Sequence, residues 1–160
     1  MKDFEPTGIG MRKKAIDIAA ALCRRFEGLV LHPYLCSAGV ATIGFGATYY
    51  LDGRRVTLKD PPISRETAER LLLLQIEQDF LPAVARLCPV LLRETPERLA
   101  AIIDFTFNLG AGNLRASTLR RKINEELWEE VPAQLMRWNK AGGRVLRGLT
   151  IRRQAEANLI

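Results

Sequence analysis

Glu27 is the residue of this chain whose position best suits acid–base chemistry. Apolar residues recur at a helical period from Ile16 to Val30, and Glu27 falls on or beside that apolar face. Gly28 then ends the helix. Apolar surroundings and the negative end of the helix dipole both disfavour a charged carboxylate. A carboxylic acid that keeps its proton near neutral pH is what a glycosidase uses as its general acid. The alternative is a solvated glutamate that ends a surface helix.

The elements around Glu27 are predicted to be one helix and a small antiparallel sheet. The helix is expected over residues 12–27. Residues 33–58 set several glycines among β-prone residues, and Asp52-Gly53 is a strong hairpin turn signal. We expect two or three strands here, and a sheet of this size must pack against helices because it is marginal alone.

A long helix is expected to connect this sheet to the rest of the chain. Pro61 and Pro62 end the sheet segment, and Ser64 is the predicted N-cap of a helix that runs to about Phe80. Its length would be about 25 Å at 1.5 Å per residue. Such a helix would join the sheet lobe to a second lobe and leave a cleft between them.

Everything after Pro82 is predicted to be helical. The segment 99–109 is nearly all apolar, so its helix, capped by Thr95, should be central. Gly110 and Gly112 are expected to end it. Further helices are expected over residues 117–124, over residues 129–138 and from about residue 150.

The composition is that of a soluble globular protein of one domain. The chain has 160 residues, a net charge of +6 and a pI of about 9.6. A basic surface suits a polyanion such as nucleic acid, anionic lipid or bacterial cell wall. Three cysteines cannot all pair with each other, which argues against a secreted disulfide scaffold.

No stretch of the sequence has the pattern of a membrane helix or of a signal peptide. Its apolar runs are shorter than the roughly 18 residues of a membrane span. The first residues carry acids and a proline where a signal peptide would be apolar. We therefore expect a protein made in the cytoplasm, which needs another component to reach a target beyond the membrane.

The residues that follow Glu27 resemble the active-site segment of the phage-type lysozymes, the endolysins of glycoside hydrolase family 24. That family has a glutamate, an aspartate or sometimes a cysteine nine positions later, and a threonine fifteen positions later. Glu27, Cys36 and Thr42 fit this spacing, with Cys36 in place of the more common aspartate. Ala47 stands where the family often has a histidine. Further matching positions are Gly28, Tyr34, Gly39, Ile43–Gly46 and Thr48.

Three later blocks extend the resemblance over about residues 15–159. They lie at residues 104–112, 117–124 and 138–156, in the order of the family. The resemblance implies an α+β, lysozyme-like fold, with a small N-terminal antiparallel β-hairpin lobe and a larger C-terminal helical lobe. A long helix joins the lobes, with a cleft between them. The single domain would cover residues 12–160, after a flexible tail at residues 1–11. The β lobe would cover about residues 28–62, and the helical lobe about residues 63–160 plus the first helix.

The family hydrolyses the β-1,4 bond between N-acetylmuramic acid and N-acetylglucosamine in peptidoglycan. This implies that Glu27 protonates the departing oxygen. Cys36 and Thr42 would lie on the other side of the sugar and act on the attacking water. In an inverting glycosidase the two catalytic groups lie roughly 6.5–9.5 Å apart. As a thiolate, Cys36 would act as a base or as a nucleophile, so either stereochemical outcome stays open. The alternative is a small, buried and inert cysteine.

The resemblance also implies contacts with the sugar. The matching positions are Thr48, Phe107, Asn108, Ser117 and Thr118. Because Phe107 and Asn108 are adjacent, they point in different directions, and one of them is expected to be core. Arg144 matches the family arginine that approaches the catalytic acid, whereas Arg152 and Arg153 are expected to form structural ion pairs.

The prediction is a muramidase, an endolysin of a phage or prophage, that needs no metal and no organic cofactor. Its partner would be peptidoglycan, with no nucleic acid and no stable membrane insertion. It would be a monomer, made in the host cytoplasm and acting in the periplasm after a holin or similar pore opens the membrane. One alternative is a lysozyme fold that binds peptidoglycan without turnover because of Cys36. A more distant one is a basic, helical nucleic-acid-binding protein.

Overall fold

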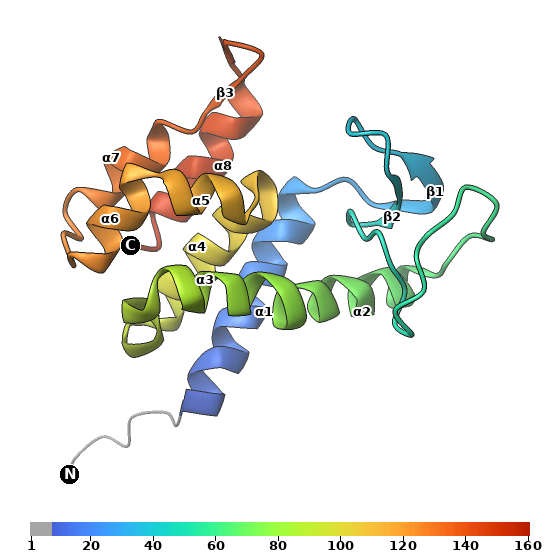
Figure 1. The fold of residues 1–160 in the computed structure, drawn as a ribbon, viewed down its shortest axis with the longest axis horizontal. Helices are drawn as coiled ribbons and strands as arrows, with labels where there is room; N and C mark the ends of the chain where they lie inside the picture. The colour runs from blue at the N-terminus through green and yellow to red at the C-terminus, as the bar shows by residue number, and fades with distance from the viewer. Residues whose placement is uncertain (1–7) are drawn as a thin grey trace.

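Two helices pack against each other at the centre of the computed structural model, which describes residues 8–160. They are α1 (Gly8–Phe26) and α4 (Pro96–Leu109). Eight residues of α4 are buried, as its apolar sequence predicts. On the facing side of α1 the buried residues are mostly small, which lets the two backbones approach closely. Figure 1 shows α1 running from the N-terminal end of the molecule towards the sheet.

Helix α1 begins earlier than its sequence pattern suggested. Residues 8–11, assigned to a flexible tail, form its first turn, and Met11 is buried in the core. The side chain of Met11 continues the apolar face by one more turn, so residues 8–11 belong to this helix. The rest of the predicted tail, residues 1–7, lies outside the described residues.

The β lobe follows directly after α1. Strands β1 (Val30–Leu35) and β2 (Ala41–Gly44) form a two-stranded antiparallel sheet in which Tyr34 lies opposite Thr42. A second turn contains Asp52 and Gly53, as predicted, and Gly53 has a φ of 84°. Positive φ is the region that glycine enters without steric cost.

A small apolar cluster holds this sheet against the connecting helix α2 (Arg65–Gln75). Its buried members are Ile43, Ala47, Val56 and Leu71. Gly44 has a φ of 70°, and a Cβ atom there would lie 3.3 Å from the Cβ of Ala68 on α2. A glycine at this position therefore allows β2 to lie directly on the helix.

The connecting helix is longer than predicted. Ser64 caps α2 as expected, but the helix does not end at Phe80. It passes through a π-helical turn, η1 (Ile76–Phe80), into α3 (Leu81–Leu87). Pro82 has no N–H group and would clash with a carbonyl of a regular α-helix. The wide η1 turn places Pro82 in the first turn of α3, where a proline is tolerated.

The remaining helices form the second lobe (Figure 1). The elements are η2 (Pro89–Arg93), α5 (Ala111–Ala116), α6 (Thr118–Asn124), α7 (Val131–Met136), β3 (Lys140–Ala141), β4 (Arg144–Val145) and α8 (Arg147–Ala157). Gly110 ends α4 with a φ of 87°, whereas Gly112 lies inside α5 instead of ending a helix. The β3–β4 hairpin turns at Gly142 and Gly143. Within residues 8–160, each helix is too short or too polar to span a membrane.

Candidate active site

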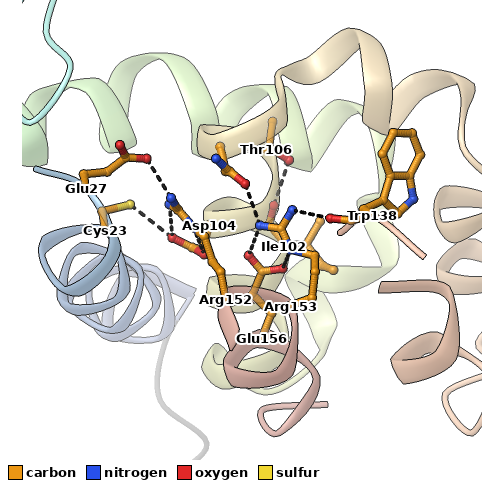
Figure 2. A network of polar contacts seen from close by, with 10 residues as sticks. Cys23, Glu27, Ile102, Asp104, Thr106, Trp138, Arg152, Arg153 and Glu156 are labelled. Atoms are coloured by element: carbon orange, nitrogen blue, oxygen red, sulfur yellow. Dashed lines mark hydrogen bonds and ion pairs between the residues drawn. The ribbon is translucent and has the colours of Figure 1, made fainter. Parts of the chain in front are cut away.

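Glu27 lies one residue beyond the end of α1, at the junction with the β lobe. Its backbone N–H donates a hydrogen bond to the carbonyl oxygen of Cys23 at 2.8 Å, which continues the helical pattern by one residue. The side chain is 28% exposed, and its Oε1 lies 2.7 Å from Nη1 of Arg152 (Figure 2). Glu27 is thus half-buried and ion-paired. The purely apolar surroundings that the helical period predicted are not what the side chain has.

Arg152 on α8 is held in place by a buried aspartate. Its Nε and Nη2 donate to the two carboxylate oxygens of Asp104 at 3.0 and 2.8 Å, and only 3% of Arg152 is exposed. This bidentate contact fixes the plane of the guanidinium group. Burial lowers the pKa of Arg152, but the hydrogen bonds and charges of Asp104 and Glu27 raise it further, so it stays charged. The remaining nitrogen therefore points a fixed positive charge at Glu27.

The arginine at Glu27 is Arg152, and the expectation for Arg144 was wrong. Arg144 is exposed in β4, on the hairpin that protrudes from the second lobe. The expectation that Arg152 and Arg153 form structural ion pairs is confirmed. Asp104 was missed as a site residue, although it is the one charged residue in the apolar segment 99–109.

Cys36 and Thr42 lie on the β1–β2 hairpin and share one face of it. Thr42 lies opposite Tyr34, and Cys36 is two residues after Tyr34, so the three side chains point to the same side. The N–H of Cys36 and the hydroxyl of Thr42 both donate to the carbonyl oxygen of Val40, at 3.0 and 2.8 Å. The structure therefore brings the two predicted residues together at one turn.

The turn favours the thiolate form of Cys36. Backbone N–H groups of Val40 and Ala38, followed by the hydroxyl of Thr42, lower the pKa of the Cys36 thiol. The Thr42 hydroxyl has one proton, so it serves either the thiolate or the Val40 carbonyl at any moment. A half-buried cysteine with this environment is chemically different from the inert, buried cysteine considered above.

Tyr34 lies in β1 of the hairpin, opposite Thr42. Partial burial raises the pKa of Tyr34, and the charges of Cys36 and Glu27 raise it further. Its phenol therefore lies within electrostatic range of both groups. The two groups come from different elements, the end of α1 and the β1–β2 hairpin.

The side chains that were predicted to contact the sugar lie in different surroundings. Phe107 packs against Phe80, with ring centroids 4.9 Å apart, at the edge of the core. The side-chain oxygen of Asn108 accepts a hydrogen bond from Arg153 at 2.9 Å, so this amide belongs to the polar network below the site. Thr48 is half-buried, and its carbonyl oxygen accepts a hydrogen bond from Val56.

Ser117 and Thr118 lie at the start of α6. The Ser117 hydroxyl caps that helix by accepting from the N–H of Arg120, and it donates to the carbonyl oxygen of Leu114. Both residues line a hollow of about 320 Å³. Its other walls come from Ala116, Gln134, Arg137 and Trp138.

Comparison with known proteins gives consistent matches. The family model described as phage lysozyme matches residues 24–156. The endolysin of Acyrthosiphon pisum secondary endosymbiont phage 1 is 36% identical over 143 residues, covering 86% of this chain and 91% of that protein. The endolysin of Bacillus phage B103 is 34% identical over 140 residues, covering 86% of this chain, which spans 50% of that relative's length. The solved endolysin from Escherichia coli O157:H7 phage FAHEc1 superposes with a TM-score of 0.73 at 29% identity, covering 98% and 95% of the two chains.

Proposed function

The chain belongs to the phage lysozyme family, and on this premise we propose that it is an endolysin muramidase with Glu27 as its catalytic acid. The family is one of glycosidases, and the substrate is peptidoglycan. The observation that carries the proposal is the position of Glu27. It is half-buried at the end of α1, it is held by a fixed arginine, and the chain leads directly from it into the hairpin that carries a cysteine and a threonine. This arrangement supplies an acid and a second group on separate elements, as glycoside hydrolysis requires.

In the proposed reaction, Glu27 donates its proton to the oxygen of the β-1,4 bond as that bond breaks. The sugar develops positive charge, and a water molecule attacks its anomeric carbon. The Cys36 thiolate accepts the proton of this water, and Thr42 orients the water through its hydroxyl. Arg152 stabilises Glu27 once it has become a carboxylate. Cys36 then releases its proton to solvent, and Glu27 takes up a proton from solvent, which restores the starting state.

The Cys36 role predicts a sharp contrast between two variants. Cys36→Ser removes the thiolate, so hydrolysis should fall by about 100-fold or more, the usual contribution of a general base. Its melting temperature should stay close to that of the wild type, because the side chain lies outside the core. Cys36→Asp should remain active, because a carboxylate supplies the same base. Release of dye from labelled peptidoglycan measures the rate, and Ser37→Ala at the exposed neighbour is the matched control.

Hydrolysis at the wild-type rate by Cys36→Ser would remove Cys36 from the mechanism. The same assay separates the enzyme from a binding protein that lacks turnover. An enzyme releases soluble dye, whereas a binding protein sediments with the labelled peptidoglycan and releases none.

We also propose that the protein acts as a monomer and reaches the cell wall from the host cytoplasm through a holin or similar pore. The net charge of +6 supports affinity for an anionic wall or surface. Lysis of cells that express the chain alone, compared with cells that also carry a membrane pore, tests the requirement for access. Lysis without any pore would contradict it.

A further inference from the structure

Arg152 places a fixed positive charge beside the proposed catalytic acid. Its Nη1 lies 2.7 Å from Oε1 of Glu27, and only 3% of Arg152 is exposed. A positive charge this close to a carboxyl group favours the ionised form of that group. A general acid, however, must hold its proton until the glycosidic bond breaks. The arginine therefore opposes the role of Glu27 unless another group offsets its charge.

Asp104 on α4 is placed to offset this charge. Its two carboxylate oxygens accept hydrogen bonds from Nε and Nη2 of Arg152 at 3.0 and 2.8 Å, and Asp104 is fully buried. Figure 2 shows the guanidinium group of Arg152 between the carboxyl groups of Asp104 and Glu27. Because water screens a buried pair only weakly, the negative charge of Asp104 also acts on Glu27.

The contacts of Asp104 are those of an ionised carboxylate. Besides the two N–H groups of Arg152, the thiol of Cys23 donates to Oδ1, with its Sγ 3.4 Å away. Burial raises the pKa of Cys23, so the thiol keeps its proton and remains a neutral donor. A carboxylate has acceptor sites for all three donors, and hydrogen bonds to the charged form stabilise that form. Asp104 therefore carries the negative charge that balances Arg152.

This group of three side chains is electrically neutral when Glu27 holds its proton. Arg152 then has one positive charge and Asp104 one negative charge, and they form a bidentate ion pair. An ionised Glu27 would add a second negative charge to a single guanidinium group. The balanced state is thus the one in which Glu27 can act as an acid.

The other buried charges on α8 form a pair of their own. Nε of Arg153 lies 2.7 Å from Oε1 of Glu156, and both side chains are fully buried. On α1, Arg25 is exposed against the ring of Phe26, so solvent screens its charge. These groups leave the charge of Arg152 to be offset by Asp104.

Two titratable groups on β1 also act on Glu27. Partial burial raises the pKa of Tyr34, and the charges of Cys36 and Glu27 raise it further, so the phenol is neutral near pH 7. Cys36 contributes the charge of its thiolate. A substitution at residue 104 leaves both side chains unchanged, so their effect is common to the wild type and its variants.

We propose that Asp104 is a positioning residue for the catalytic acid: it orients Arg152 and offsets its charge, so that Arg152 holds Glu27 in place while Glu27 keeps its proton. The inference rests on the proposed function, in which Glu27 is the acid. When the proton has moved to the departing oxygen, the same guanidinium group stabilises the new carboxylate. Asp104 thereby sets how strongly the arginine acts on Glu27 before that step.

Asp104→Asn tests this offset, because it removes the negative charge and nearly preserves the shape. The ¹³C NMR signal of the Glu27 carboxyl group, assigned by its absence in Glu27→Gln, gives the pH at which Glu27 is half-ionised. This midpoint should move down by about one pH unit in Asp104→Asn, the lower end of the effect of a neighbouring arginine. Adding Arg152→Met removes the positive charge as well, so the midpoint of the double variant should rise again by about the same amount.

Asp17→Asn is the matched control, because it removes the same charge from an exposed side chain of α1. Its midpoint for Glu27 should equal that of the wild type, since solvent screens the charge of Asp17. Asp104→Ser is the second variant. Its small side chain avoids facing the guanidinium group with the NH₂ donor of an amide, so it replaces Asp104→Asn if that protein does not fold. The same downward movement of the midpoint is expected.

Hydrolysis provides a second readout. A midpoint lower by one pH unit leaves about a tenth as much protonated Glu27 at neutral pH, so the kcat of Asp104→Asn should fall about tenfold there. The loss should become smaller towards acidic pH, where Glu27 is protonated in both proteins. Titration of Cys36 occurs in both and cancels in the ratio. A purely structural role of Asp104 would lower the melting temperature but give a kcat ratio that does not depend on pH.

An unchanged Glu27 midpoint in folded Asp104→Asn or Asp104→Ser would overturn the inference. So would a midpoint in the double variant as low as that of Asp104→Asn, because Arg152 would then not be the cause of the change. The NMR titration needs no activity. A wild type without hydrolysis would therefore refute the proposed function, while the midpoints would still test the effect of Asp104 on Glu27.

Discussion

Replacing Glu27 with glutamine should reduce peptidoglycan hydrolysis by about a thousandfold, within the range of 10²–10⁴ that a general acid contributes. The amide has the size of the acid but cannot release a proton to the departing oxygen. The protein should remain folded, because Arg152 keeps both hydrogen bonds to Asp104 in this variant. Dye release from labelled peptidoglycan gives the rate, and a thermal melt gives the folded state.

Glu77→Gln provides the matched control for this experiment. Glu77 is exposed in η1, on the connecting helix, so its replacement makes the same chemical change away from the site. Its rate should equal that of the wild type. If Glu27→Gln were folded and hydrolysed peptidoglycan as fast as the control, Glu27 could not be the acid.

Replacing Arg152 with methionine should affect both stability and activity. Removal of one partner of a buried ion pair typically destabilises a protein by about 3–5 kcal/mol, because the other charge is left without a partner. Here Asp104, which is fully buried, would lose both hydrogen bonds from the guanidinium group. At about 2–4 °C per kcal/mol for a protein of this size, the melting temperature should fall by roughly 6–20 °C. Hydrolysis should also fall, because Glu27 loses its only ion-pair partner among the described residues.

Arg144→Met is the control for Arg152→Met, because it removes the same group from an exposed hairpin. Its melting temperature and rate should match the wild type. Arg152→Lys should give an intermediate result, since a lysine keeps the charge but cannot form the bidentate contact. A melting temperature for Arg152→Met equal to that of Arg144→Met would show that the buried contacts do not stabilise the fold.

Caps and turns could be predicted because each depends on a few neighbouring residues. Ser64 and Thr95 accept hydrogen bonds from the first turns of α2 and α4, as their positions suggested. Gly53 occupies the turn that its neighbour Asp52 indicated. The continuation of the helix beyond Phe80 could not be predicted, because a proline two residues later normally ends a helix. Beyond this point α3 packs against α4 and α5, contacts that the local sequence does not show.

The charged partners of the site were harder to predict, because they come from distant parts of the chain. Arg152 lies 125 positions from Glu27 and 48 positions from Asp104. A family block assigned the role to Arg144, but the β3–β4 hairpin carries that side chain into solvent. The common position of Cys36 and Thr42 was easier to predict, because the register of one hairpin places both side chains on the same face.

The environment of Cys36 differs from that of the buried Cys23 and Cys88, and this makes the protein selectively sensitive to electrophiles. Burial raises the pKa of the Cys88 thiol to about 12 and raises that of Cys23 further, whereas the hairpin turn lowers the pKa of Cys36. Only a thiolate reacts quickly with alkylating reagents or peroxide. Among the three, Cys36 is therefore the one that a mild dose of iodoacetamide would label, and oxidative stress in the host would act on the lytic machinery at that same sulfur.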